Sequence, residues 1–139
     1  MKRIIILLIA IGLILVSCSK DSTKNRVYSS SWDNTPIVVE QKNNDNDYHK
    51  INEITDATQV ERLIKALKNA NWEENTDVDI EPPDYRFVWN SFHHNVWVIE
   101  ATGRLQLTID ERSNFVTLSK SSSKIVFEIL TGEELQEHK

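Results

Sequence analysis

The strongest constraint on the fold is a series of short segments of alternating polarity between residues 85 and 118. Apolar side chains recur at every second position in residues 85–90 and again in residues 105–109, which is the period of a strand with one buried face. Residues 96–99 and 115–118 are short apolar runs that predict two further strands. The connections, residues 90–95 and 110–114 among them, are too short for crossovers, so consecutive strands must be antiparallel neighbours. This stretch therefore predicts a four-stranded β-meander.

Two amphipathic segments predict helices that cover this meander. Residues 57–70 follow Asp56, an N-capping residue type, and carry one apolar stripe: Val60, Leu63, Ile64 and Leu67. The second segment begins at a Ser119 or Ser121 cap and ends at Gly132, where a left-handed C-cap is expected. Its inward stripe is predicted to be Ile125, Val126, Ile129 and Leu130. Weaker patterns in residues 36–40 and 48–54, separated by a polar turn, predict two more strands. We expect one small α+β domain over residues 27–135, an antiparallel β-meander packed against two helices.

The N-terminus carries the pattern of a secretory signal. Lys2 and Arg3 precede an uninterrupted apolar run over residues 4–16, which would rise only about 20 Å as a helix against a bilayer core of roughly 30 Å. The run is followed by Ser17 and Cys18, and residues 15–18 resemble the bacterial lipoprotein signal. That resemblance implies that Leu15, Val16 and Ser17 are the recognition site and that Cys18 receives the lipid. Residues 1–17 are then a cleaved signal peptide, and the lipidated Cys18 and polar residues up to 26 form a flexible tether.

Composition excludes several classes of function. The chain has 21 acidic against 16 basic residues, two of which leave with the signal, so an acidic surface argues against nucleic-acid binding. Cys18 is the single cysteine, so no disulfide or redox pair can form. No serine-nucleophile elbow or phosphate-binding glycine loop is present. We expect no cofactor.

Three local features are candidates for function, each with a structural alternative. The run Pro82-Pro83-Asp84-Tyr85 either presents Asp84 and Tyr85 at a rim or is only a stiff entry into the next strand. Trp89 and Trp97 either pair on one sheet face to stack on a sugar or peptide, or belong to the core.

His93 and His94 are expected in a hairpin turn. Adjacent histidines can bind a metal weakly, but they lack converging further ligands, so no metal site is assigned. Trp32, in polar surroundings, is the tryptophan expected to be most exposed. The binding surface predicted from these features is Asp84, Tyr85, Trp89, His93 and His94. It requires the face of Tyr85, Phe87 and Trp89 to be open.

A further resemblance covers residues 51–132. It rests on four runs that are similar to the YhfM-type domain of small Bacillus-group lipoproteins: Asn71-Trp72, Pro82-Pro83-Asp84-Tyr85, Val96-Trp97-Val98 and Phe127-Glu128-Ile129-Leu130-Thr131-Gly132. The resemblance implies an envelope location and a single domain, and it implies no catalytic residues.

Two hypotheses about function remain at this point. The first is a lipoprotein held on the extracytoplasmic face of the cell membrane through Cys18, whose domain is a non-catalytic binding module for an envelope protein, a peptide or a cell-wall glycan. The second is a small envelope hydrolase or transfer enzyme without a known motif. A pocket with converging polar groups favours the enzyme, whereas an exposed aromatic patch or sheet edge favours the binding module.

Overall fold

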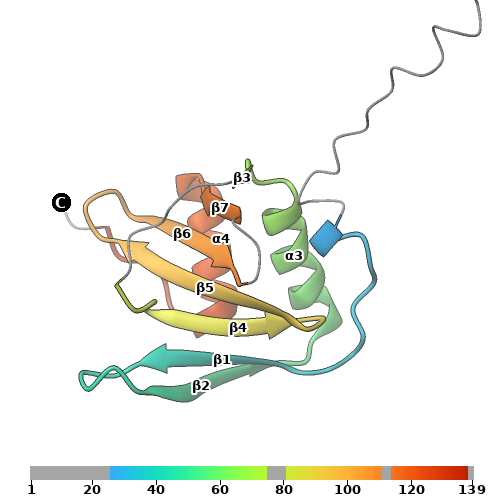
Figure 1. Cartoon of the computed structure of the whole chain (residues 1–139), viewed down its shortest axis with the longest axis horizontal. Helices are drawn as coiled ribbons and strands as arrows, with labels where there is room; N and C mark the ends of the chain where they lie inside the picture. Colours follow the sequence, from blue (N-terminus) through green and yellow to red (C-terminus); the bar gives the residue numbers. More distant parts are fainter. Residues whose placement is uncertain (1–25, 75–80, 111–113, 138–139) are drawn as a thin grey trace, which may run out of the picture.

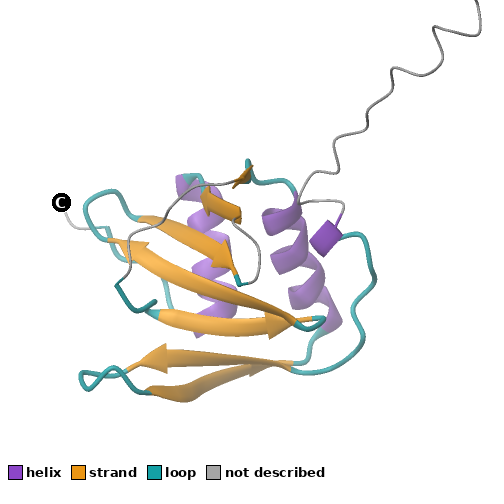
Figure 2. Cartoon of the chain, in the orientation of Figure 1, coloured by secondary structure: helices purple, strands orange, loops and turns teal. Residues whose placement is uncertain are grey.

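The computed structural model describes residues 26–74, 81–110 and 114–137. In these residues, seven strands form one sheet in the order β2-β1-β4-β5-β6-β7-β3, and every neighbouring pair is antiparallel. Both helices, α3 and α4, lie on one face of the sheet and contact each other (Figures 1 and 2). The elements are β1 Ile37–Lys42, β2 Tyr48–Ile54, α3 Ala57–Lys68, β3 Glu73–Glu74, β4 Tyr85–Trp89, β5 Phe92–Ile99, β6 Arg104–Ile109, β7 Asn114–Thr117 and α4 Lys120–Thr131. The α+β class and the single small domain are confirmed.

Strands β4 to β7 form the predicted meander, with one correction. The β4–β5 connection was expected to span residues 90–95, but β5 already begins at Phe92. The reason is a two-residue turn in which Asn90 and Ser91 both adopt positive φ angles, 45° and 69°. Positive φ at both central residues is the geometry whose twist matches an antiparallel hairpin. His93 and His94 therefore lie inside a strand, and the prediction that they occupy a turn is wrong.

The two outer parts of the sheet come from the start of the chain and from the segment after α3. The β1–β2 hairpin was predicted as two strands, and it attaches to β4 through β1. Strand β3 was not predicted: Glu73 and Glu74 are exposed, and they pair with Phe115 and Asn114 of β7.

Alternation along the strands divides the sheet into two faces. The helix-covered face carries the buried side chains, among them Phe87, Val96 and Leu107, each at most 2% exposed. The open face carries the intervening side chains, such as Val88, Trp97 and Gln106, which are partly or largely exposed. The core therefore lies between one face of the sheet and the two helices.

Helix α3 begins and packs as predicted. The Asp56 carboxylate accepts hydrogen bonds from the amides of Thr58 (2.8 Å) and Gln59 (3.1 Å), which satisfies two of the donors left free at a helix start. Val60, Leu63 and Leu67 are buried. Ile64, the fourth residue of the predicted stripe, is partly buried and packs against the core.

Helix α4 buries three of the four residues of its predicted stripe, Val126, Ile129 and Leu130. Ser119 caps it and Gly132 ends it with φ of 75°, as expected. Its buried residues, however, are Ser123, Val126, Phe127, Ile129 and Leu130, whereas Ile125 is 37% exposed. The Ser123 hydroxyl accepts from the Leu105 amide (2.9 Å). Because Ser123 must face β6 to make this bond, Ile125 turns outward and Phe127 turns inward.

Candidate functional site

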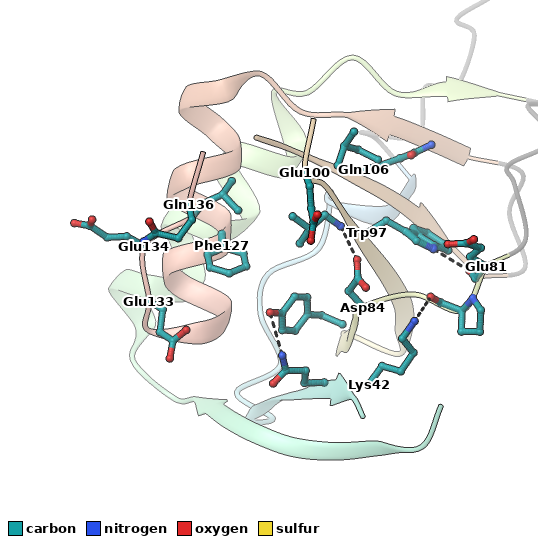
Figure 3. Close-up of a pocket in the computed structure, with 16 residues that line it drawn as sticks. Lys42, Glu81, Asp84, Trp97, Glu100, Gln106, Phe127, Glu133, Glu134 and Gln136 are labelled. Carbon is teal, nitrogen blue, oxygen red and sulfur yellow. Dashed lines mark hydrogen bonds between the residues drawn. The ribbon is translucent and has the colours of Figure 1, made fainter. Parts of the chain in front are cut away.

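A hollow of about 630 Å³, here called the end cavity, lies at one end of the sheet (Figure 3). It lies where β1 ends, β4 begins and β5 ends, and residues 133–136, which follow α4, close its other side. A volume of this size falls within the range of small-molecule sites.

The Pro82-Pro83-Asp84 run builds the end cavity by stopping β4. Proline has no amide hydrogen, so β4 cannot extend backwards beside β5. The amide of Val98 on β5 would then lack a partner, and the Asp84 carboxylate accepts its hydrogen bond at 2.8 Å. Asp84 also accepts from the Lys42 amide through its backbone oxygen (2.9 Å). The run is therefore a stiff entry into β4, and two of its residues, Pro82 and Asp84, also line the cavity.

Side chains around the run fix it in place. The Tyr48 hydroxyl donates to the Pro83 carbonyl (2.7 Å), and the Trp97 indole donates to the Glu81 carbonyl (2.9 Å). The Lys42 ammonium donates to the Pro82 carbonyl (3.3 Å). Three neighbouring strands thus hold the run, and the cavity wall that it forms is preorganised.

Three aromatic side chains line the end cavity: Tyr85, Trp97 and Phe127. Tyr85 is 9% exposed and meets Phe127 edge to face, with ring centroids 5.8 Å apart and planes at 86°. Its hydroxyl accepts a hydrogen bond from the Gln41 amide at 3.3 Å. In the described residues, no acceptor receives the hydroxyl proton of Tyr85 itself.

The charge of the end cavity is strongly negative. Five carboxylates line it, those of Glu81, Asp84, Glu100, Glu133 and Glu134, together with one amine, that of Lys42. No lysine or arginine within the described ranges forms an ion pair with any of the five carboxylates. Burial raises the pKa of Tyr85, and the charges of Asp84 and Glu133 raise it further, while the Gln41 hydrogen bond acts in the opposite direction. The negative potential therefore reaches the buried phenol.

A second hollow of about 600 Å³, here called the open-face groove, lies over β1, β4 and β5 toward the other end of the sheet. Val38 and Val88, each 40% exposed, give it an apolar floor. Ser91, His93 and Asp110 also line it. Serine, histidine and aspartate are the residue types of an acyl-transfer triad. Among the described residues, no hydrogen bond joins the side chains of these three, so no activated nucleophile is assembled there.

The predicted binding residues separate into three groups. Asp84 and Tyr85 line the end cavity, and His93 lies on the open face. Trp89 and His94 are buried under the helices, 1% and 0% exposed. The predicted surface along Tyr85, Phe87 and Trp89 is wrong, because this is the helix-covered face.

The core alternative is confirmed for Trp89, which faces the helices and is 1% exposed. Trp97 lies on the open face opposite Gln106, so the two tryptophans do not pair. Trp32 does not stand out as the exposed tryptophan: it is partly buried, as are Trp72 and Trp97, and packs against the core.

His94 is held neutral by its surroundings. Its Nδ1 lies 2.9 Å from the Phe92 carbonyl, which can only accept, so Nδ1 carries the proton. Nε2 then has a free lone pair and accepts from the Tyr28 hydroxyl at 2.9 Å. The ring stacks on Phe87, with centroids 4.6 Å apart. Burial lowers the pKa of His94 to about 4, against smaller opposing effects of the Phe92 carbonyl and Asp110.

Most of the cavity residues carry no local signal in the sequence. Phe127, Glu133 and Leu135 come from the end of the chain, and Gln41 and Lys42 come from its first hairpin. The Phe127 run was noted only for the family resemblance. Nothing local signals that these segments meet.

Cys18, Leu15, Val16 and Ser17 lie outside the described residues. In the part of the chain that is described, no three His, Cys, Asp or Glu side chains are grouped so that they could hold a metal ion. No helix within residues 26–74, 81–110 and 114–137 is long and apolar enough to cross a membrane. Comparisons with protein-family models, curated proteins and solved structures found no match to this chain, and the resemblance to the YhfM-type domain stays a prediction.

Proposed function

We propose that this chain is a lipoprotein anchored through Cys18 on the extracytoplasmic face of the cell membrane, and that its domain is a non-catalytic binding module. The observation that carries the binding role is the end cavity. It combines aromatic walls, five carboxylates and a rim held by hydrogen bonds from three neighbouring strands. Such a combination of apolar walls with a few placed polar groups is typical of ligand sites.

The position of the end cavity supports this role for an anchored protein. The described chain starts at Arg26, beside the β4–β5 turn: the Asn90 side chain donates to the Ser31 carbonyl (2.8 Å) and accepts from the Asp33 amide (3.1 Å). The end cavity is at the opposite end of β5, whose eight residues span about 25 Å. Figure 1 shows the start of the described chain and the end of β5 at opposite ends of the sheet. In an anchored protein, the tether would therefore join the domain at the end opposite to the cavity.

Anchoring is tested by labelling cells with a radiolabelled fatty acid. Cys18→Ala should abolish incorporation of the label and leave the precursor unprocessed, because the thiol is the attachment point that the signal implies. Ser19→Ala is the matched control and should be labelled as the unchanged protein is. Label on the Cys18→Ala protein would refute the anchor.

Binding at the cavity is tested by the fluorescence of the full-length protein in detergent micelles, titrated with peptidoglycan fragments and envelope peptides. A ligand in the end cavity should change the emission of Trp97, which lines it. Trp97→Phe should remove that change, whereas Trp32→Phe, at the other end of the molecule, should keep it. A response that survives in Trp97→Phe and disappears in Trp32→Phe would place the ligand elsewhere.

A further inference from the structure

We infer that the end cavity binds a short basic peptide, with a lysine or arginine side chain among the carboxylates and a backbone carbonyl accepting a hydrogen bond from Tyr85. This inference rests on the proposed binding function and names the class of ligand. Two independent features of the cavity support it, one for each group of the ligand.

The first feature is the hydroxyl proton of Tyr85. The side chain is 9% exposed and lines the cavity. Its oxygen already accepts from Gln41 at 3.3 Å, and no hydrogen bond within the described residues uses its proton. Because Tyr85 lines the cavity, an oxygen of a ligand can accept that proton. A peptide carbonyl is an acceptor without charge, which suits a cavity where an anion would be repelled.

The second feature is the combination of charge and aromatic walls. The ammonium of Lys42 is already engaged by the Pro82 carbonyl (3.3 Å), and in the described part of the chain no basic side chain pairs with the cavity carboxylates. Figure 3 shows the carboxylates of Glu81, Glu100 and Glu133 on different sides of the cavity. A cation in the cavity would therefore lie in a region of negative charge, whichever carboxylate it contacts. Trp97 and Phe127 offer rings for the aliphatic stem and for cation–π contact.

A basic residue of a peptide carries both of the groups that these two features call for. A lysine or arginine has a carbonyl at one end and a cation at the other, with an apolar stem between them. The cavity of about 630 Å³ accommodates a few residues, not a folded domain. The net charge of the chain, −5, would also increase the association rate of a cationic ligand at low salt.

The test uses the full-length protein in micelles of a neutral detergent and isothermal titration calorimetry. The probes are capped tripeptides, Ala-Lys-Ala, Ala-Arg-Ala, Ala-norleucine-Ala and Ala-Glu-Ala, together with spermidine. The capped termini confine the charge to the side chain. The lysine and arginine peptides should bind, and norleucine, which keeps the stem without the charge, should bind at least tenfold more weakly. Spermidine, which has cations but no carbonyl, reports on the carboxylates alone.

Variants test which protein side chain contacts the carbonyl of the ligand and which contacts its cation. Tyr85→Phe keeps the ring and removes the donor, so it should weaken the lysine peptide about tenfold and leave spermidine unchanged. Glu133→Gln should weaken both cationic probes and reduce their dependence on salt. Glu61→Gln is the control, because Glu61 is an exposed residue of α3 outside the cavity, and it should change neither.

The outcomes separate this inference from the proposed function. Equal affinity for the lysine and norleucine peptides, or an unchanged affinity in Tyr85→Phe, would overturn the basic-peptide assignment. If a glycan fragment or the glutamate peptide bound instead and changed Trp97 emission, the cavity would remain a binding site and only the ligand class would be wrong. If none of these probes and none of the envelope panel bound, both proposals would fail.

Discussion

The two faces of the sheet differ in how deeply they bury the side chains of the same strands. On the helix-covered face, β4 and β5 place Phe87 opposite His94, and both are buried, 2% and 0% exposed. One residue further along, on the open face, Val88 lies opposite His93, and both are exposed. Burial is therefore decided by position in the register and not by residue type, since a histidine is buried while a valine is exposed.

The two adjacent histidines make the contrast sharpest. His94 is buried because the fold provides it with two hydrogen-bond partners, Tyr28 and Phe92, and an aromatic ring to stack on. A buried polar group is tolerated only when it is hydrogen-bonded. His93 faces the open-face groove and needs no such arrangement. On the helix-covered face of the β-hairpin, a polar side chain thus needs hydrogen-bond partners within the protein. On the open face it does not.

The largest effect that tests this contrast is truncation on β4. Phe87→Ala should lower the free energy of unfolding by about 3–5 kcal/mol, as for other buried aromatics, because it leaves a cavity under the helices. Val88→Ala, the adjacent open-face residue, should lower it by well under 1 kcal/mol. Urea unfolding followed by tryptophan fluorescence measures both. Similar losses from the two variants would mean that the open face is also covered.

The next effect is a dependence of stability on pH that comes from His94. Its folded pKa of about 4 lies below the ordinary value of 6.5, so between these pH values the unfolded chain binds a proton that the folded protein does not. The free energy of unfolding that depends on neutral His94 is therefore at its full value above about pH 6.5. It falls by about 3 kcal/mol as the pH is lowered toward 4.

Chemical unfolding at pH 7 and at pH 4.5 measures this dependence. His94→Leu should show a smaller loss between the two pH values than the unchanged protein, since the carboxylates common to both cancel in the difference. His93→Leu is the control on the open face and should keep the full slope. An equal slope in His94→Leu would show that His94 does not titrate as described.

A smaller effect is expected from Tyr28→Phe. The variant keeps the ring contacts with Trp72 and Trp89 but removes the hydroxyl that donates to His94. A buried acceptor without a partner costs about 1–3 kcal/mol. The loss should shrink in the His94→Leu background, where the acceptor is absent, and a double-mutant cycle measures that difference. Full additivity of the two losses would contradict the hydrogen bond.

Elements that depend on neighbours in the sequence could be predicted. The Asp56 cap, the stripe of α3, the Gly132 end of α4 and the meander all follow from spacing within one or two turns or strands. The β4–β5 turn could not, because the sequence Asn90-Ser91 lacks the glycine that usually marks such a turn. The polarity of the two histidines predicts a loop, whereas the alternation in residues 92–99 predicts the strand that the structure has.

The candidate site depends on long-range contacts, and only part of it could be predicted. Asp84 and Tyr85 could be predicted as candidate site residues because two prolines restrict the backbone before them. Their neighbours Gln41 and Phe127 lie more than 40 residues away in the chain, and Tyr28, which satisfies His94, is 66 residues distant. Which face of β4 is covered depends on where the helices dock, and alternation alone makes both faces equally suitable.

The smallest effect is expected on the open face, at the pair of Glu40 and Arg86. Their side chains meet at 3.0 Å but are 38% and 42% exposed, and Arg86 also lies over the Tyr48 ring, 3.5 Å from its centroid. Glu40→Gln removes the charge and keeps the shape, so the stability should fall by less than 1 kcal/mol, and by still less at high salt. Urea unfolding at low and high salt measures this. A loss comparable with that of Phe87→Ala would mean that the pair is shielded from water, and the open face would then be a covered interface in solution.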